Sequence, residues 1–307
     1  IPLTMYANYD TTTFETISEV LENYYAEKNI YSRIRQKSVD LRKIVATALE
    51  RNVKKYDLQI KQQKDAEKKD KYKLYGELLQ AYGYGIEPGA KFAEVENYYD
   101  NNALIKIPLD PDFSALDNSK KYFEKYGKLK RTSEALEGLI EETHSQIVHL
   151  ESIQNALDIA TSADDLIQIK EELMEYGFIK KNRSAKKEKS KSKPFHYRSS
   201  DGYDIFVGKN NYQNDELSFK VATGNDWWFH AKGMPGSHVI VKSNNEELPD
   251  KVFEEAGRLA GYYSKGRDNE KIEIDYLQKK NLKKPSGAAP GFVVYYTNYS
   301  LVIEPDI

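Results

Sequence analysis

The residue types best suited to chemistry lie close together in the C-terminal third of the chain. Residues 208–215 have the sequence GKNNYQND, residues 226–230 have DWWFH, and residues 235–238 have PGSH. Ammonium and carboxamide groups can hydrogen-bond phosphate oxygens or base edges, and indole or imidazole rings can stack on bases. This composition indicates nucleic-acid binding, with the candidate contacts Lys209, Asn210, Asn211, Asn214, Trp227, His230 and His238.

A structural role is the alternative for the same cluster. The first motif also fits a strand-to-helix turn in which Asn214 caps the helix, and the tryptophans also fit a hydrophobic core. We expect Trp228 to lie in the core. For Lys209 and Asn211 the residues alone leave both roles open.

Two further basic groups extend the candidate surface. Lys283 and Lys284, with Lys279 and Lys280 just before them, precede a loop rich in glycine and proline at residues 285–291 that could approach a phosphate backbone closely. Lys265 and Arg267 follow a helix predicted over 249–263, whose C-terminal dipole favours cations. These four residues, Lys265, Arg267, Lys283 and Lys284, join the predicted nucleic-acid contacts.

No residue set has the pattern of an enzyme active site. Asp226, His230 and His238 match no metal-ligand spacing. Ser237 and His238 are neighbours on a predicted strand, so their side chains would point to opposite faces and cannot act as a pair. The phosphate-binding loop motif is absent, and with no cysteine there is no thiol nucleophile. We therefore expect a binding protein with no catalytic residues, no metal and no cofactor.

Charge is distributed in blocks along the 307 residues. The chain has 46 basic and 48 acidic residues, a net charge of −2. Residues 1–179 have 24 basic and 31 acidic side chains, residues 180–193 have 8 and 1, and residues 194–307 have 14 and 16. This pattern predicts an acidic arm, a mobile basic linker and a balanced C-terminal domain. No apolar run of about 18 residues is present, so we expect no membrane insertion.

The arm has the pattern of a helical hairpin. Apolar residues recur at helical spacing from Leu41 to Ile60, and a heptad seam runs from Leu129 to Leu157. We therefore predict one long helix over 13–81, a second over 114–160, and an antiparallel coiled coil between them. The insert at 82–113 breaks both helices with glycine and proline, and it contains two predicted strands, 92–98 and 104–109, which form a β tip.

The C-terminal domain, residues 194–307, is predicted to be α+β. Short apolar runs predict strands at 203–207, 227–231, 238–241, 272–277, 292–296 and 301–303, and helices at 214–222 and 249–263. A capping box at Ser162 and Asp165 predicts a short helix within 161–179. The predicted fold class is thus α+β, a long antiparallel coiled-coil hairpin with a small β tip (13–160) followed by an α+β domain.

Taken in order, these motifs resemble a known family. Residues 207–215, 226–230, 235–239, 263–265 and 283–291 are similar to the C-terminal NFACT-R domain of the NFACT, or fibronectin-binding protein A, family. The match covers nearly all of residues 194–307, and the two long helices resemble the family's middle coiled coil. Residues 1–12 resemble the remnant of a preceding N-terminal region, so the chain corresponds to a C-terminal half.

The resemblance implies two functions of different classes. Family members act in ribosome-associated quality control, where they bind large ribosomal subunit RNA and tRNA so that alanine is added to stalled chains. Gram-positive members are also described as anchorless surface adhesins that bind host fibronectin. The first function implies a cytoplasmic protein and the second a cell-surface one. The lack of cysteine and of a signal peptide fits either.

Overall fold

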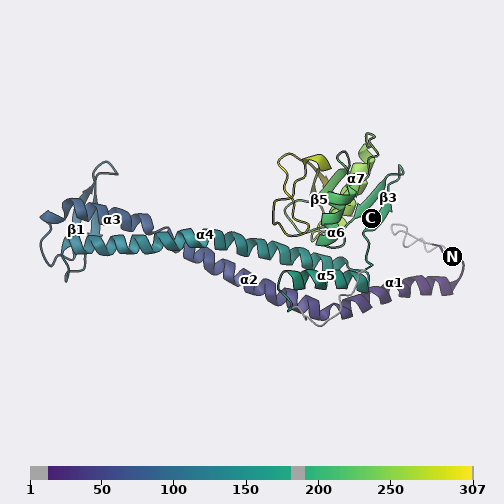
Figure 1. The fold of residues 1–307 in the computed structure, drawn as a ribbon, viewed down its shortest axis with the longest axis horizontal. Coiled ribbons are helices and arrows are strands. Elements are labelled where there is room, and N and C mark those ends of the chain that lie inside the picture. The colour runs from purple at the N-terminus through teal and green to yellow at the C-terminus, as the bar shows by residue number, and fades with distance from the viewer. Residues whose placement is uncertain (1–12, 181–190, 306–307) are drawn as a thin grey trace. The chain divides into compact units, whose positions relative to one another are not determined.

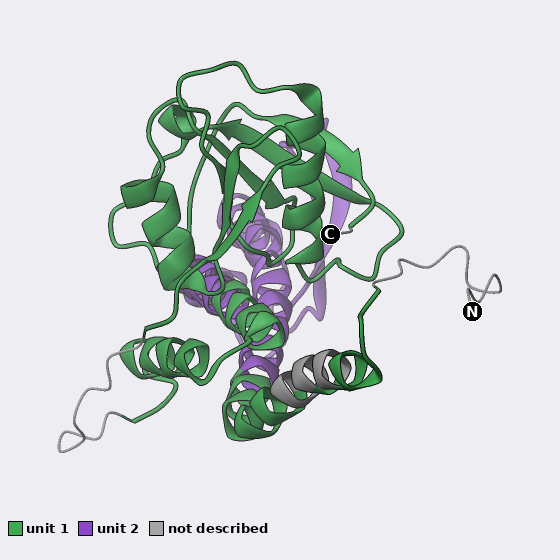
Figure 2. Ribbon diagram, turned by 90° about the vertical axis from the view of Figure 1, so that its right-hand side faces the viewer, with its two compact units in different colours: residues 1–48, 148–307 green, residues 49–147 purple. Residues whose placement is uncertain are grey.

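The computed structural model describes residues 13–180 and 191–305. The chain forms two compact units, one of residues 1–48 with 148–307 and one of residues 49–147, which Figure 2 shows in different colours. The sequence-predicted remnant at 1–12, and all of the basic linker except Lys180 and residues 191–193, lie outside the described residues. The long helices and antiparallel sheets confirm the predicted α+β class.

The single helix predicted over 13–81 is wrong, because this segment forms three helices. They are α1 (Ile17–Lys37), α2 (Val39–Ala66) and α3 (Lys69–Tyr82). The first break falls at Ser38, whose buried hydroxyl donates to the backbone oxygen of Arg35 at 2.9 Å and accepts from Arg42 Nε at 3.0 Å. Serine hydroxyls that bond the backbone in this way compete with regular helical structure.

The unit of residues 49–147 is an antiparallel helical hairpin. Its returning helix is α4 (Ala115–Ile159), which continues beyond the unit (Figure 1). Gln63 Nε2 donates to Ser133 Oγ at 3.2 Å, and further along Ser119 Oγ donates to the backbone oxygen of Gly76 at 2.7 Å. A Cβ at Gly76 would lie 2.9 Å from the Phe123 ring, so glycine permits this close approach of α3 and α4.

The predicted β tip is confirmed. After the short helix η2 (Gly83–Gly85), β1 (Phe92–Asn97) pairs antiparallel with β2 (Ala103–Pro108). Asn101 and Asn102 form the turn with positive φ values of 47° and 57°, a conformation that asparagine tolerates. The hairpin packs its inner face on α3, with Leu78, Leu79 and Ile107 fully buried.

The other unit contains the C-terminal domain and the helix that precedes it. The predicted capping box is confirmed, since Ser162 caps α5 (Ala163–Glu175) together with Asp165. A six-stranded antiparallel sheet follows, in the order β3-β4-β6-β5-β7-β8. Its strands are β3 (Phe195–Arg198), β4 (Asp204–Val207), β5 (Trp227–Ala231), β6 (Val239–Val241), β7 (Ile272–Gln278) and β8 (Tyr299–Ile303).

Both faces of this sheet are covered. Phe229 belongs to a core cluster that also contains residues of α7 (Asp250–Tyr262). The adjacent Trp228 belongs to a second cluster, formed with η3 (Leu217–Val221) and the segment that follows η4 (Lys279–Asn281). Alternation along β5 sends the two side chains to opposite faces, and both are fully buried. The expected core position of Trp228 is confirmed.

Three local predictions in this domain need correction. The strand expected at 292–296 does not form, because among the described residues its backbone pairs with a neighbouring segment at Val294 alone, in an isolated bridge to Lys283. Val293 and Tyr295 nevertheless pack on the Trp228 cluster. The helix expected at 214–222 begins earlier as α6 (Asn211–Glu216) and continues as η3. Strand β3 was missed because its four residues are too short for a recognisable pattern.

Across the described ranges, no helix is both long and apolar enough to cross a membrane.

The packing of the β tip can be tested by hydrogen exchange. Replacing Ile107 by alanine should lower the local unfolding free energy of the hairpin by about 2–5 kcal/mol, because it leaves a cavity against α3. Leu104→Ala is the matched control on the same strand, since that side chain is 74% exposed. Equal amide protection of β1 and β2 in the two variants would contradict the packing.

Candidate nucleic-acid interface

The motif at 208–215 lies against α5 and the end of α4 rather than against solvent. Asn211 Nδ2 donates to Ser152 Oγ at 2.8 Å and to Glu172 Oε1 at 2.7 Å. Asn210 Nδ2 donates to Gln168 Oε1 at 2.6 Å, and its own side-chain oxygen caps α6. We call the eight residues that connect the helices to the domain the junction cluster: Ser152, Asp165, Gln168, Glu172, Lys209, Asn210, Asn211 and Gln213.

Lys209 forms the charged part of the junction cluster. Its Nζ lies 3.5 Å from Asp165 Oδ1 and 4.5 Å from the centre of the Phe195 ring, and its side chain is only 12% exposed. Burial by itself would raise the pKa of Asp165. Hydrogen bonds from Ser192 and Thr161, with the charge of Lys209, outweigh that effect and lower the pKa. The Asp165 carboxylate is therefore ionised, and it is hydrogen-bonded and ion-paired within the protein.

Asn214 has a structural role of a different kind from the predicted cap. Its Oδ1 accepts from the backbone N–H of His238 at 3.0 Å and holds the start of β6 beside α6. A Cβ at Gly208 would lie 2.2 Å from that Oδ1, so only glycine fits at this crossing. The residues Asn210, Asn211 and Asn214 are all buried, and each donates a hydrogen bond from Nδ2 within the protein.

Of the two histidines, His238 is buried and His230 is partly exposed. His230 stacks on Trp228 at 5.6 Å, and His238 Nδ1 is 2.7 Å from Ser218 Oγ. Burial lowers the pKa of His230 to about 4. Burial and the neighbouring His230 lower the pKa of His238 well below its usual value. Both rings are therefore neutral near pH 7 and offer no charge to a phosphate.

Trp227 is half-buried on the other side of β5. Its indole packs edge-on against Phe253 of α7, with ring centres 4.8 Å apart, and also lies near Tyr276 and Tyr299. The ring is thus part of an aromatic group that extends the core toward the surface. Only its exposed edge could contact a base.

The two basic groups outside the motif are more accessible. Lys265 is 58% exposed and pairs with Glu151 at 3.0 Å, and Arg267 lies over the Tyr262 ring. Lys284 is less available, because it pairs with Asp215 of α6. Lys283 is exposed, and its Nζ lies 5.7 Å from the centre of the Tyr296 ring.

Tyr296 and Phe292 are two exposed aromatic residues that sequence reasoning missed. Their side chains are 83% and 47% exposed. The sequence placed them in a strand, where one would expect half of the side chains to be covered. We call Lys283, Phe292 and Tyr296 the Lys283 surface, in which the Tyr296 ring is the one shown beside the Lys283 ammonium group. A cation beside open aromatic rings is the combination that single-stranded nucleic acids require.

Within the described residues, no group of three histidine or carboxylate side chains is positioned to hold a metal ion. Asp226, once a candidate ligand, accepts from the backbone N–H groups of Thr223 and Ser243 and pairs with Lys242. Its carboxylate fixes the turn before β5.

The chain thus combines a helical hairpin with a two-stranded tip and an α+β domain with a six-stranded sheet. Two family profiles match the chain: "NFACT N-terminal and middle domains" over residues 1–192 and "NFACT protein RNA binding domain" over residues 193–296. The chain belongs to the NFACT family.

Individual relatives agree with this assignment. The chain is 40% identical to "Rqc2 homolog RqcH" of Streptococcus suis and 36% identical to that of Bacillus subtilis. Each match covers 95% of this chain and 52% of the relative, so the chain spans about half the length of these proteins. A solved structure of the C-terminal of the fibronectin/fibrinogen-binding protein from Streptococcus suis is similar, with a TM-score of 0.68 and 37% identity. That match covers 89% of this chain and 96% of that one.

The charged part of the junction cluster predicts a pH dependence of stability. Because the folded-state pKa of Asp165 is lowered, its contribution is present above the unfolded pKa of about 3.9 and is lost as the pH falls through the folded value. Asp165→Asn should lower the unfolding free energy by about 1–3 kcal/mol at pH 7. The difference in unfolding free energy between this variant and the unmodified chain should disappear as the pH falls below about 4.

Urea unfolding followed by tryptophan fluorescence, repeated from pH 7 to pH 3, measures this gap. Asp201→Asn, at an exposed turn, is the control and should show none. A gap for Asp165→Asn that does not change with pH would contradict the ionised pair.

Proposed function

We propose that this chain is a non-catalytic, RNA-binding half of a cytoplasmic ribosome-associated quality-control factor. The observation that carries the proposal is the match of residues 193–296 to the family's RNA-binding domain, within a chain related to proteins called Rqc2 homolog RqcH. In this proposal the arm contacts the large ribosomal subunit, and the C-terminal domain contacts ribosomal RNA and tRNA. Addition of alanine to stalled chains would be an activity of the whole factor, which this half supports by binding.

The Lys283 surface is the part of the domain best suited to contact RNA. The predicted contacts in the junction cluster are satisfied internally, whereas Lys283 and Tyr296 present an ammonium group and an open ring side by side. The backbone bridge between Lys283 and Val294 fixes their spacing, with both N–H···O distances at 2.9 Å. A phosphate beside Lys283 would place the neighbouring base within reach of the Tyr296 ring.

The β tip is the proposed contact with the large subunit. Tyr84, Tyr99 and Leu104 are 89%, 64% and 74% exposed. Exposed aromatic and aliphatic side chains are what protein and RNA surfaces both bind well, by burial and by stacking. The packed core beneath them keeps these side chains in fixed positions.

The Lys283 surface can be tested by cosedimentation with large ribosomal subunits and by RNA titration. Replacing both Lys283 and Tyr296 by alanine should weaken binding by about 1–3 kcal/mol for the lost stacking. The slope of log affinity against log salt should fall by about 1 for the lost phosphate contact. Tyr296→Phe keeps the ring and should bind nearly as well as the unmodified chain.

Lys251→Ala is the charge control, since this lysine is exposed on α7. Binding by the double variant equal to that of the control would remove the Lys283 surface from the proposal. Failure of the unmodified chain to cosediment would remove the ribosomal function itself.

Fibronectin binding is a second candidate, favoured by the similarity to a fibronectin/fibrinogen-binding protein over 89% of the chain. It would make this chain part of a surface adhesin. Immobilised fibronectin should then capture the chain at physiological salt, and micromolar protein should saturate the surface. No capture at that concentration would count against this candidate.

A further inference from the structure

A basic pocket lies in the unit that contains the C-terminal domain, away from the Lys283 surface residues. Its volume is about 550 Å³, within the range of ligand sites. Three segments meet there: the α1–α2 connection, the end of α4, and the connection between α7 and β7. Its charged lining residues are Arg35, Arg42, Asp158, Lys265, Arg267 and Asp268.

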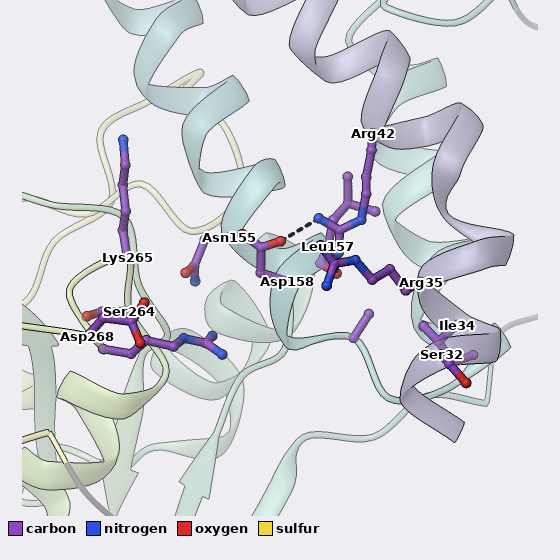
Figure 3. Close-up of a pocket in the computed structure, with 12 residues that line it drawn as sticks. Ser32, Ile34, Arg35, Arg42, Asn155, Leu157, Asp158, Ser264, Lys265 and Asp268 are labelled. Atoms are coloured by element: carbon purple, nitrogen blue, oxygen red, sulfur yellow. Dashed lines mark hydrogen bonds and ion pairs between the residues drawn. The ribbon is translucent and has the colours of Figure 1, made fainter. Parts of the chain in front are cut away.

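Figure 3 shows how these side chains lie. Arg35 extends from its helix toward Asp158 and Arg42, while Ser264, Lys265 and Asp268 line the opposite side. Four cations face two carboxylates, so the pocket has an excess of positive charge. Sequence reasoning found Lys265 and Arg267 but not Arg35 and Arg42, which come from the distant N-terminal helices.

The pairing of these cations is incomplete. Arg42 pairs with Asp158 and donates a hydrogen bond to Ser38, and Lys265 pairs with Glu151. Nη2 of Arg267 is buried and has no hydrogen-bond partner. Among the described residues, none accepts a hydrogen bond from the Arg35 side chain. Arg35 is exposed, and both arginines line the pocket. An acceptor that enters the pocket would therefore meet guanidinium groups with unused donors, and pairing them would be favourable.

The side chains that line the pocket indicate which kind of hydrogen-bond acceptor would bind there. Guanidinium groups bind phosphate through two parallel N–H donors, and Asn155 and Ser264 add neutral polar groups at the same site. The apolar lining is small, namely Ile34, Leu157 and Ala160, which offers little surface on which a base could stack. The pocket therefore fits a phosphate better than a whole nucleoside.

We propose that this pocket binds a phosphate group of an RNA strand, held by Arg35 and Arg267 with support from Lys265. The proposal rests on the RNA-binding function above and adds to it a second contact point, where the strand's backbone is bound without reading its bases. A free phosphate would present the same oxygens, and the experiment separates these two sources.

The test compares Arg35→Ala/Arg267→Ala with a matched double variant, Lys251→Ala/Arg258→Ala, which removes the same charge from exposed positions on α7. Titration of a fluorescent single-stranded RNA at several salt concentrations should show the pocket variant about tenfold weaker. Its salt slope should be lower by about 0.7, for the one lost phosphate contact on a single strand. The α7 variant should keep the affinity of the unmodified chain within about twofold.

A second arm uses inorganic phosphate alone, with thermal stability as the readout. Millimolar phosphate should raise the melting temperature of the unmodified chain more than an equal concentration of chloride, and it should not do so for the pocket variant. Arg35→Glu is a further variant on an exposed helix position. It should abolish the phosphate effect without loss of the folded circular-dichroism spectrum.

Loss of both effects in the pocket variant supports the proposal. RNA binding equal to that of the α7 variant overturns it while the proposed function stands, and a retained phosphate effect would remove the pocket altogether. If only the phosphate effect is lost, the pocket takes free phosphate and the RNA contact is wrong. If the unmodified chain binds no RNA, the proposed function fails, and the phosphate arm still decides whether the pocket is an anion site.

Discussion

Two buried carboxylates, Asp165 and Glu172, set the main constraint on the C-terminal half of this chain. Both lie on α5 and are almost completely removed from solvent. An ionised carboxylate in that position is strongly destabilising unless donors surround it. The domain that follows supplies Lys209 to Asp165 and Asn211 to Glu172, while Thr161 and Ser162 also donate to Asp165 and His149 Nε2 lies 2.7 Å from Glu172 Oε1. The short helix and the domain are therefore held together by hydrogen bonds and an ion pair to these two buried side chains.

This requirement determines which surfaces remain available for binding. A motif rich in lysine and asparagine has the composition of a nucleic-acid contact, but its donors are used within the junction cluster. The proposed RNA contacts therefore lie where cations are exposed or incompletely paired. The Lys283 surface provides the first such place, since Lys283 and Tyr296 lie side by side in solvent. The basic pocket provides the second, because Arg267 has a buried donor without a partner.

The unit of residues 49–147 combines polar contacts between its helices with an apolar cluster at the tip. Ser119 and Gln63 make the interhelical hydrogen bonds, and the apolar cluster forms where β1 and β2 pack on α3. At the tip, exposed side chains such as Tyr84 therefore lie beside a packed apolar cluster.

The sequence by itself determined the elements that depend on local periodicity and turn chemistry. The strands of the β tip, the capping box at Ser162 and the α+β class follow from residue spacing, because backbone hydrogen bonds and side-chain alternation are local constraints. The break at Ser38 was less visible, since one serine does not interrupt an apolar stripe. The sequence did not show that β3 forms a paired strand and that the segment at 292–296 does not, because strand formation depends on a partner that can be distant in sequence.

Only the tertiary structure decided which polar residues are free to bind. Lys209 and Lys283 are chemically the same side chain. One is paired with Asp165 across more than forty positions of sequence, and the other is exposed beside a tyrosine. Arg35 and Arg267 come from opposite ends of the chain and line one pocket. Burial and charge pairing depend on distance in space, and a single sequence contains that information only through the complete fold.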